Sequence, residues 1–223
     1  MAHTWDPDRY LAYADERGRP FVELLARIDD PAPATVVDLG CGPGNLTALL
    51  ADRWPSADLR GVDSSPEMSA EARAAHPEVA FEIGDVRDWR PAEPVDVLVS
   101  NATLQWVPGH LDLLPGLLTA VRPGGRLAFQ VPGNFDQPSH TIRTELAATP
   151  PYDAHTGDVA VPTAQPRRVS GTGARPTLQA LPDDLRPGFE EEFRARLRAA
   201  YPETDGQVVL PFRRVFVVAQ TPD

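Results

Sequence analysis

The chain has 223 residues, a formal net charge of −11 and one cysteine. This length suits one domain with a small appended cap. The negative charge argues against a nucleic-acid partner, because binding to phosphates needs a basic face. No apolar run is long enough to span a membrane, and residues 1–10 lack the apolar centre of a signal peptide. We therefore expect a cytoplasmic protein without a membrane or nucleic-acid partner.

The N-terminal segment predicts a helix with one apolar face. Its apolar residues follow i, i+3, i+4, i+7 spacing: Phe21, Leu24, Leu25 and Ile28. Four further side chains suit a lid over a ligand pocket, or equally an ordinary solvated helix face: Tyr10, Tyr13, Arg17 and Arg19.

Residues 36–47 read Val-Val-Asp-Leu-Gly-Cys-Gly-Pro-Gly-Asn-Leu-Thr. The pattern predicts a buried strand, a glycine-rich turn and a helix over about residues 46–53, with N–H groups at the helix start facing the turn. Glycine lets a ligand approach the backbone closely. The dinucleotide fingerprint is G-x-G-x-x-G, whereas Gly40, Gly42 and Gly44 alternate behind Asp38. The stretch therefore predicts a nucleoside-cofactor site, and the spacing counts against an NAD-dependent oxidoreductase. Cys41 suits a small buried residue better than a nucleophile.

The next strand, over residues 59–63, ends in an acid. Asp63 lies 23 residues after Gly40, where a carboxylate can accept hydrogen bonds from both ribose hydroxyls. The alternative is a plain acid at a helix entry, since Ser65 as N-cap and Pro66 in the first turn start a helix. A third strand is expected over residues 79–83.

A fourth strand, over residues 95–99, leads to Ser100, Asn101, Gln105 and Trp106. In open α/β sheets the ligand crevice lies beyond the carboxyl ends of the strands. Asn101 and Trp106 are therefore candidates for ligand contacts there, with a core aromatic as the alternative for Trp106.

The rest of the chain predicts a fifth strand and a helical segment. A helix over residues 110–121, a turn at residues 122–125 and a strand over residues 126–132 follow one another. Pro138 opens another helix with Ser139 as its N-cap, and His140 is either a substrate contact or structural. Residues 149–176 are rich in proline. A helix over residues 178–201 and a last strand or hairpin over residues 208–219 complete the chain.

The segment Asp-Leu-Gly-Cys-Gly-Pro-Gly over residues 38–44 resembles motif I of the class I S-adenosylmethionine-dependent methyltransferases. A narrower resemblance is to the trans-aconitate 2-methyltransferase family. It rests on Trp-Asp-Pro at residues 5–7, Asn-Ala-Thr-Leu-Gln-Trp at residues 101–106 and Phe-Arg-Arg-Val-Phe at residues 212–216. Family members are longer by a few tens of residues before the segment at residues 170–173. Either the cap is shortened here or residues are absent from this sequence.

The resemblance implies S-adenosylmethionine as the cofactor. It implies that Asp85 accepts the exocyclic amine of adenine and that the Val86 backbone contacts the ring. The expected cofactor-binding residues are Asp38, Gly40, Gly42, Gly44, Asn45, Asp63, Ser64, Asp85, Val86 and Asn101.

The family also implies methyl transfer to a carboxylate oxygen. A carboxylate is ionised at pH 7, so we expect neither a general base, a catalytic residue nor a metal. A small anionic substrate needs local cations. The expected substrate-binding residues are Tyr10, Arg17, Arg19, Trp106, His140, Arg175, Arg213 and Arg214. Neighbouring residues of a strand face opposite ways, so at most one of the last two should point inward.

The predicted fold class is α/β: a Rossmann-like, doubly wound, mostly parallel sheet with helices on both faces and a small helical cap. The expected divisions are an N-terminal lid at residues 1–30, a cofactor-binding core at 31–135, a cap at 136–205 that is short near 157–169, and a final strand within 206–223. We expect a monomer. Two alternatives remain open: a small-molecule O- or N-methyltransferase with another acceptor, and a non-catalytic S-adenosylmethionine-binding module.

Overall fold

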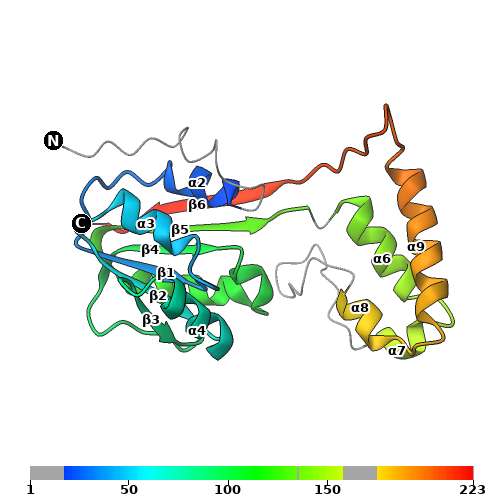
Figure 1. Ribbon diagram of the computed structural model, residues 1–223, viewed down its shortest axis with the longest axis horizontal. Coiled ribbons are helices and arrows are strands. Elements are labelled where there is room, and N and C mark those ends of the chain that lie inside the picture. The colour runs from blue at the N-terminus through cyan, green and yellow to red at the C-terminus, as the bar shows by residue number, and fades with distance from the viewer. Residues whose placement is uncertain (1–17, 135, 158–174, 223) are drawn as a thin grey trace. The chain divides into compact units, whose positions relative to one another are not determined.

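The computed structural model describes residues 18–134, 136–157 and 175–222 (Figure 1), apart from the side chains of residues 175 and 176. The chain divides into two compact units. The first, here the sheet unit, comprises Met1–Leu104, Asp112–Val131 and Val215–Asp223. The second, the helical unit, comprises Gln105–Leu111 and Pro132–Arg214. No helix in the described part is both long and apolar enough to cross a bilayer.

A six-stranded sheet in the order β3-β2-β1-β4-β5-β6 forms the sheet unit. The strands are β1 (Thr35–Leu39), β2 (Asp58–Asp63), β3 (Ala80–Ile83), β4 (Val95–Asn101), β5 (Val121–Pro132) and β6 (Arg214–Gln220). Strands β1 to β5 are parallel, and Val36 pairs with Leu59 on one side and Val97 on the other. Strand β6 runs antiparallel to β5, since residue 124 pairs near residue 221 and residue 133 near residue 213. The predicted doubly wound, mostly parallel sheet is confirmed.

The predicted helices α2 (Arg19–Leu25), α3 (Thr47–Arg53) and α4 (Pro66–Ala75) are present. Apolar spacing predicted the first, the preceding glycine-rich turn the second, and a capping residue the third. The Oγ of Ser65 caps α4 by accepting the N–H of Met68 at 3.2 Å. The three helices contribute to one apolar cluster with residues from five strands. This packing fixes the strand order and brings the carboxyl ends of the parallel strands to one edge.

The helical unit is built on α6 (Pro138–Ala147), α7 (Asp153–Thr156), α8 (Arg175–Ala180) and α9 (Arg186–Ala200). Helix α6 lies beside α9, as Figure 1 shows. Their small apolar core gathers Leu146, Ala147, Tyr152, Leu181 and Phe189. The rings of Tyr152 and Phe189 meet edge to face with centroids 5.0 Å apart, a favoured aromatic geometry.

Several predicted boundaries are wrong. The helix expected over residues 110–121 is a 3₁₀ turn, η2 (His110–Leu113), followed by the short α5 (Leu114–Thr119). The turn expected at residues 122–125 lies inside β5, where the register with β4 shifts, so these residues form a bulge. The helix expected over residues 178–201 is two helices. Ser139 does not cap α6, whose N-cap is Gln137.

The final strand is shorter than predicted, and it lies at an edge of the sheet. Residues 208–212 form no strand, and Val208, Val209 and Leu210 are exposed. Within the described residues β6 pairs only with β5. The other edge of β6 is therefore unpaired in the described part of the chain.

Candidate functional site

The glycine-rich loop lies between the carboxyl end of β1 and the start of α3. Gly40, Gly42 and Gly44 all have positive φ, at 84°, 58° and 80°. The N–H groups of Gly40 and Cys41 both donate to the carbonyl of Val62, at 2.7 and 3.1 Å. The loop therefore takes a left-handed conformation that favours glycine, and backbone bonds from β2 hold its first residues.

Asp63, the last residue of β2, binds this loop directly. One carboxylate oxygen accepts the N–H of Gly42 at 2.8 Å, and the other accepts the N–H of Ser65 at 2.9 Å. Both oxygens have lone pairs left for further donors. The structure therefore places Asp63 between the loop and α4, and its contact with a ribose stays a prediction.

Side chains from the end of β4 hold the loop from the other side. The Oγ of Ser100 donates to the carbonyl of Leu39 at 2.7 Å, and the Oγ1 of Thr103 donates to the carbonyl of Gly40 at 3.1 Å. A Cβ placed on Gly40 would lie 2.2 Å from the Thr103 hydroxyl oxygen. Position 40 therefore needs a glycine for two reasons: a side chain there would clash with Thr103, and its φ is positive.

Asp38 takes a position that sequence reasoning did not foresee. Its side chain is buried, and one oxygen accepts the hydroxyl of Thr47 at 2.7 Å. Burial raises the pKa of Asp38 to about 6. This hydrogen bond joins β1 to the first turn of α3. Within the described residues, Asp38 therefore stabilises the two elements that flank the loop. Its predicted direct contact with the cofactor stays untested.

We expect Asp38 to make stability depend on pH. Because its pKa rises from 3.8 to about 6 on folding, the folded state binds this proton more tightly than the unfolded state. The free energy of unfolding should therefore fall as the pH rises from about 4 to about 6, by about 3 kcal/mol, and then level off. Asp38→Asn should lose this dependence. Urea unfolding of both proteins at four pH values measures it.

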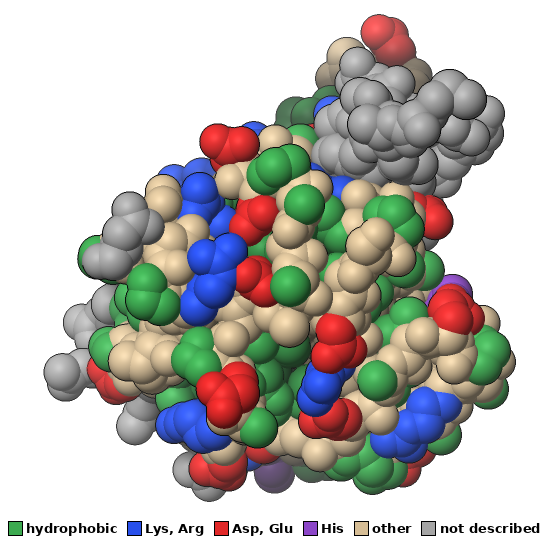
Figure 2. All heavy atoms as spheres, turned by 90° about the vertical axis from the view of Figure 1, so that its left-hand side faces the viewer, with side chains coloured by type: hydrophobic (Ala, Val, Ile, Leu, Met, Phe, Trp, Pro, Cys, Tyr) green, Lys and Arg blue, Asp and Glu red, His purple; other side chains and the backbone are tan. Residues whose placement is uncertain are grey.

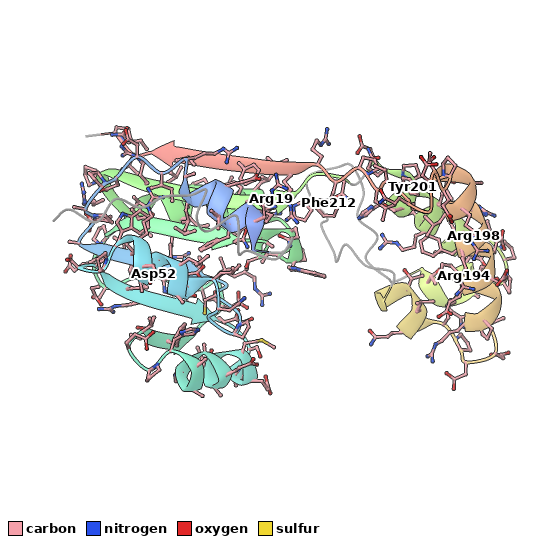
Figure 3. All side chains as sticks on the ribbon, turned by 45° about the horizontal axis from the view of Figure 1, so that its top comes forward. Arg19, Asp52, Arg194, Arg198, Tyr201 and Phe212 are labelled. Atoms are coloured by element: carbon pink, nitrogen blue, oxygen red, sulfur yellow. The ribbon has the colours of Figure 1, made fainter. Side chains whose placement is uncertain are left out.

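Asp52 supplies the matched control, because it is an exposed carboxylate on α3 (Figure 3). Asp52→Asn should leave the pH profile of the parent unchanged. Parallel profiles for the parent and Asp38→Asn would contradict the role given to burial.

The other predicted cofactor residues lie at the same carboxyl edge. The N–H of Gly84 donates to the carbonyl of Asp63 at 3.0 Å, which brings the end of β3 to β2. Asp85 is held by the guanidinium of Arg87, which lowers the pKa of this carboxyl to about 2. Val86 is buried, whereas Asn45 and Ser64 are exposed. Asp85 therefore offers an ionised carboxylate at this edge, and its contact with adenine stays a prediction.

The residues present fit a nucleoside cofactor with an amino-acid part. Asn101 ends β4, and its Oδ1 is buried without a hydrogen-bond partner in the described part of the chain. A buried acceptor of this kind favours a donor such as an ammonium group. Apart from its own chain neighbours, no described residue lies within 4 Å of the position that a Cβ on Gly42 would take, so these residues leave room for a ligand at the loop backbone.

Cys41 lies in the loop but is chemically inert. It is buried, it forms no disulfide, and burial raises the pKa of its thiol to about 12. A thiol that stays protonated is a poor nucleophile. The prediction of a small buried residue is confirmed.

The expected substrate residues fall partly outside the described residues. Tyr10, Arg17 and the side chain of Arg175 cannot be placed. Trp106 is 53% exposed, so it is not a core aromatic. His140 is buried, and burial together with the charge of Arg143 lowers its pKa. The structure does not test their contacts with a substrate.

Of the three remaining candidate arginines, Arg19 and Arg213 are exposed and Arg214 is partly buried. Arg19 pairs with Glu23 at 3.0 Å. Arg213 donates to the carbonyl of Gly133 at 2.6 Å, and the guanidinium of Arg214 lies over the ring of Phe212 at 4.7 Å. Their roles in substrate binding stay predictions.

Sequence reasoning missed Thr47, Thr103 and Arg143. Thr47 and Thr103 bond to residues nine and 63 positions earlier in the chain, and no local pattern gives such pairs. Arg143 is buried on α6. Its spacing of three residues from His140 places the two on one helix face, which is the signal that could have found it.

One cavity of about 350 Å³ lies away from this edge. Its lining includes Thr35, Asp58 and Val95, which are the first residues of β1, β2 and β4. Val62 near the end of β2 and Glu82 near the end of β3 also line it, so the cavity runs along these strands, and none of the predicted site residues lines it. Figure 2 looks at the molecule from the side where β5 begins, and acidic and basic side chains are interspersed on that face.

The sequence of this chain is similar to those of known methyltransferases. A methyltransferase-domain model matches residues 36–125, which span the glycine loop and the ends of β2, β3 and β4. The chain is 49% identical to a trans-aconitate 2-methyltransferase of Streptomyces coelicolor, with 100% of this chain and 88% of the relative covered. It is 44% identical to the corresponding proteins of Streptomyces avermitilis and an Azoarcus species, covering 97% of this chain and 96% and 98% of theirs.

The relatives are longer within the aligned region. The alignment with the Streptomyces coelicolor protein runs over 267 positions, against 223 residues of this chain, a difference of 44 positions. The expectation that family members are longer is confirmed. The identity nevertheless extends over nearly the whole of both proteins, and the chain belongs to the trans-aconitate 2-methyltransferase family of S-adenosylmethionine-dependent methyltransferases.

Proposed function

We propose that this chain transfers a methyl group from S-adenosylmethionine to a carboxylate oxygen of a small polycarboxylic acid, most favourably trans-aconitate, giving the monomethyl ester. The observation that carries the proposal is the identity of 44–49% to curated trans-aconitate 2-methyltransferases over nearly the whole chain. We further propose a cytoplasmic monomer whose partner is a small anionic molecule, without nucleic acid or membrane.

The residues of the sheet unit would hold the cofactor as follows. Asp63 accepts the ribose hydroxyls while it keeps Gly42 in place, and Asn101 Oδ1 accepts the ammonium group of the amino-acid part. The backbone of the glycine loop would lie against the middle part of the cofactor. When bound, S-adenosylmethionine supplies an electrophilic methyl group on its sulfonium.

The acceptor needs no activation by the protein. Its carboxylate is ionised at pH 7, so a general base would add nothing. Within the described residues no three His, Cys, Asp or Glu side chains gather as a metal site would require. The contribution of this chain is therefore to place the acceptor in line with the methyl group and to exclude water from both.

Incubation with methyl-labelled S-adenosylmethionine and trans-aconitate tests the proposal. We expect label in a methyl ester that base hydrolyses, and none when the acid or the protein is left out. Label transferred instead to uncharged acceptors would favour a methyltransferase with another substrate. Absence of transfer to any carboxylic acid would contradict the proposal.

A non-catalytic S-adenosylmethionine-binding module is the second candidate. It is favoured by the 44 positions of the alignment with the Streptomyces coelicolor relative at which this chain has no residue, because a loss confined to the acceptor region would leave cofactor binding intact. Tight binding of the cofactor by calorimetry without turnover on any acceptor would support this candidate.

A further inference from the structure

Helix α6 has one buried face of mixed chemistry. Its buried residues are His140, Arg143, Leu146 and Ala147, and this spacing puts them on one side of the helix. Leu146 and Ala147 join the apolar core of the helical unit. The same face therefore changes from apolar at the carboxyl end of the helix to basic and polar at its amino end.

Further polar groups gather at that amino end. The hydroxyl of Tyr201, which follows α9 (Figure 3), accepts the N–H of Ser139 at 3.1 Å. The Oγ of Ser139 lies 3.1 Å from Nδ1 of His140. Asn134, just before the helix, is 3% exposed, and its Oδ1 has no partner in the described part of the chain. Buried polar groups are normally satisfied by a partner, so this end of α6 has the character of a binding site.

Arg143 differs from every other described arginine in its burial. It is 4% exposed, and it is the one Arg in the buried class among the residues that the structure describes. Burial lowers the pKa of Arg143. A guanidinium binds a carboxylate through two parallel hydrogen bonds, so Arg143 has the donor geometry for an anionic group.

The exposed arginines are weaker candidates for the same task. Attraction between charges is screened at the surface and is several times stronger in a buried site. The side chains of Arg19 and Arg213 are 68% and 67% exposed. A carboxylate is therefore attracted more strongly by a buried guanidinium than by either of them.

We propose that Arg143 binds a carboxylate group of the acceptor, with the imidazole of His140 as a second hydrogen-bonding group one helical turn away. The proposal rests on the proposed function, because it assigns an acceptor contact for that reaction. Arg143 is thus a binding residue, distinct from the loop residues that hold the cofactor.

Calorimetric binding of trans-aconitate in the presence of S-adenosylhomocysteine tests this without requiring turnover. Arg143→Met keeps much of the apolar stem and removes the charge. We expect it to weaken binding of the acid about tenfold or more and to raise KM for the acid correspondingly, with the Kd for S-adenosylmethionine unchanged. Arg143→Lys keeps the charge but lacks the planar fork. Its affinity for the acid should lie between those of the parent and Arg143→Met.

Arg198→Met is the matched control, because Arg198 is an exposed arginine of α9 in the same unit (Figure 3). It should bind the acid as the parent does. Thermal unfolding and cofactor binding show whether each variant is folded. If Arg143→Met is not folded, the affinity of Arg143→Lys for the acid tests the assignment instead.

Two results overturn the assignment: binding of the acid by a folded Arg143 variant within about twofold of the parent, or no binding of the acid by the parent. A parent that binds trans-aconitate tightly through Arg143 but forms no methyl ester would instead overturn the proposed function and leave the assignment standing.

Discussion

Gly40→Ala is expected to abolish measurable binding of S-adenosylmethionine, raising its Kd by about 100-fold or more. A methyl group there would lie 2.2 Å from Oγ1 and 2.3 Å from Cγ2 of Thr103, far inside van der Waals contact. The backbone also has φ of +84°, which costs a residue with a side chain about 1–2 kcal/mol. The loop must therefore move, and its contacts with β2 and β4 move with it. Calorimetry with the cofactor measures the loss.

Two further variants separate the clash from the backbone strain. Gly206→Ala changes a glycine of the helical unit that has φ of +74° and no described residue, beyond its chain neighbours, within 4 Å of the added Cβ. It should therefore show strain alone and bind the cofactor normally. Gly40→Ala combined with Thr103→Ala removes the side chain that the new methyl meets, and it should recover part of the affinity. If the single variant Gly40→Ala bound as tightly as Gly206→Ala, the close packing of Thr103 on the loop would be disproved.

Asp63→Asn is expected to raise the Kd for S-adenosylmethionine by about 10- to 100-fold. The carboxylate accepts N–H groups from both Gly42 and Ser65, at 2.8 and 2.9 Å. An amide has only one acceptor oxygen, so its NH₂ group would face one of these donors. Ribose binding weakens at the same time. A nucleoside that lacks the amino-acid part, 5′-methylthioadenosine, should therefore lose affinity by a similar factor.

Asp58→Asn is the control on the same strand. Asp58 begins β2, is exposed, and pairs with Arg60 at 2.8 Å, a surface ion pair of small energetic value. Its replacement should leave cofactor affinity unchanged. Equal Kd values for the Asp63 and Asp58 variants would show that the end of β2 does not contact the cofactor.

The local pattern of the sequence was sufficient for the cofactor half of the fold. Alternating glycines after a run of buried residues predicted the loop, and Ser65 before Pro66 predicted the start of α4. These features depend on backbone angles and on hydrogen bonds between near neighbours. The placement of Asp63 at the end of its strand followed in the same way.

Boundaries that depend on pairing were predicted less well. Residues 122–125 have the composition of a turn, yet β5 runs through them as a bulge because β4 pairs on both sides of the insertion. Residues 208–212 have the apolar composition of a strand but form none in the structure. A strand needs a partner as well as a propensity, and the sequence does not say where that partner lies.

By itself, the sequence determined the glycine loop, the order of strands β1 to β4 with helices α2 to α4, and the acid at the end of β2, since each is specified by residues within a few positions of one another. Only the tertiary structure decided that Asp38 bonds Thr47 under the loop and that Thr103 packs on Gly40. It also decided that the cation buried on α6 is Arg143. Burial and hydrogen bonds between distant residues arise when the elements pack, and composition and periodicity do not contain them.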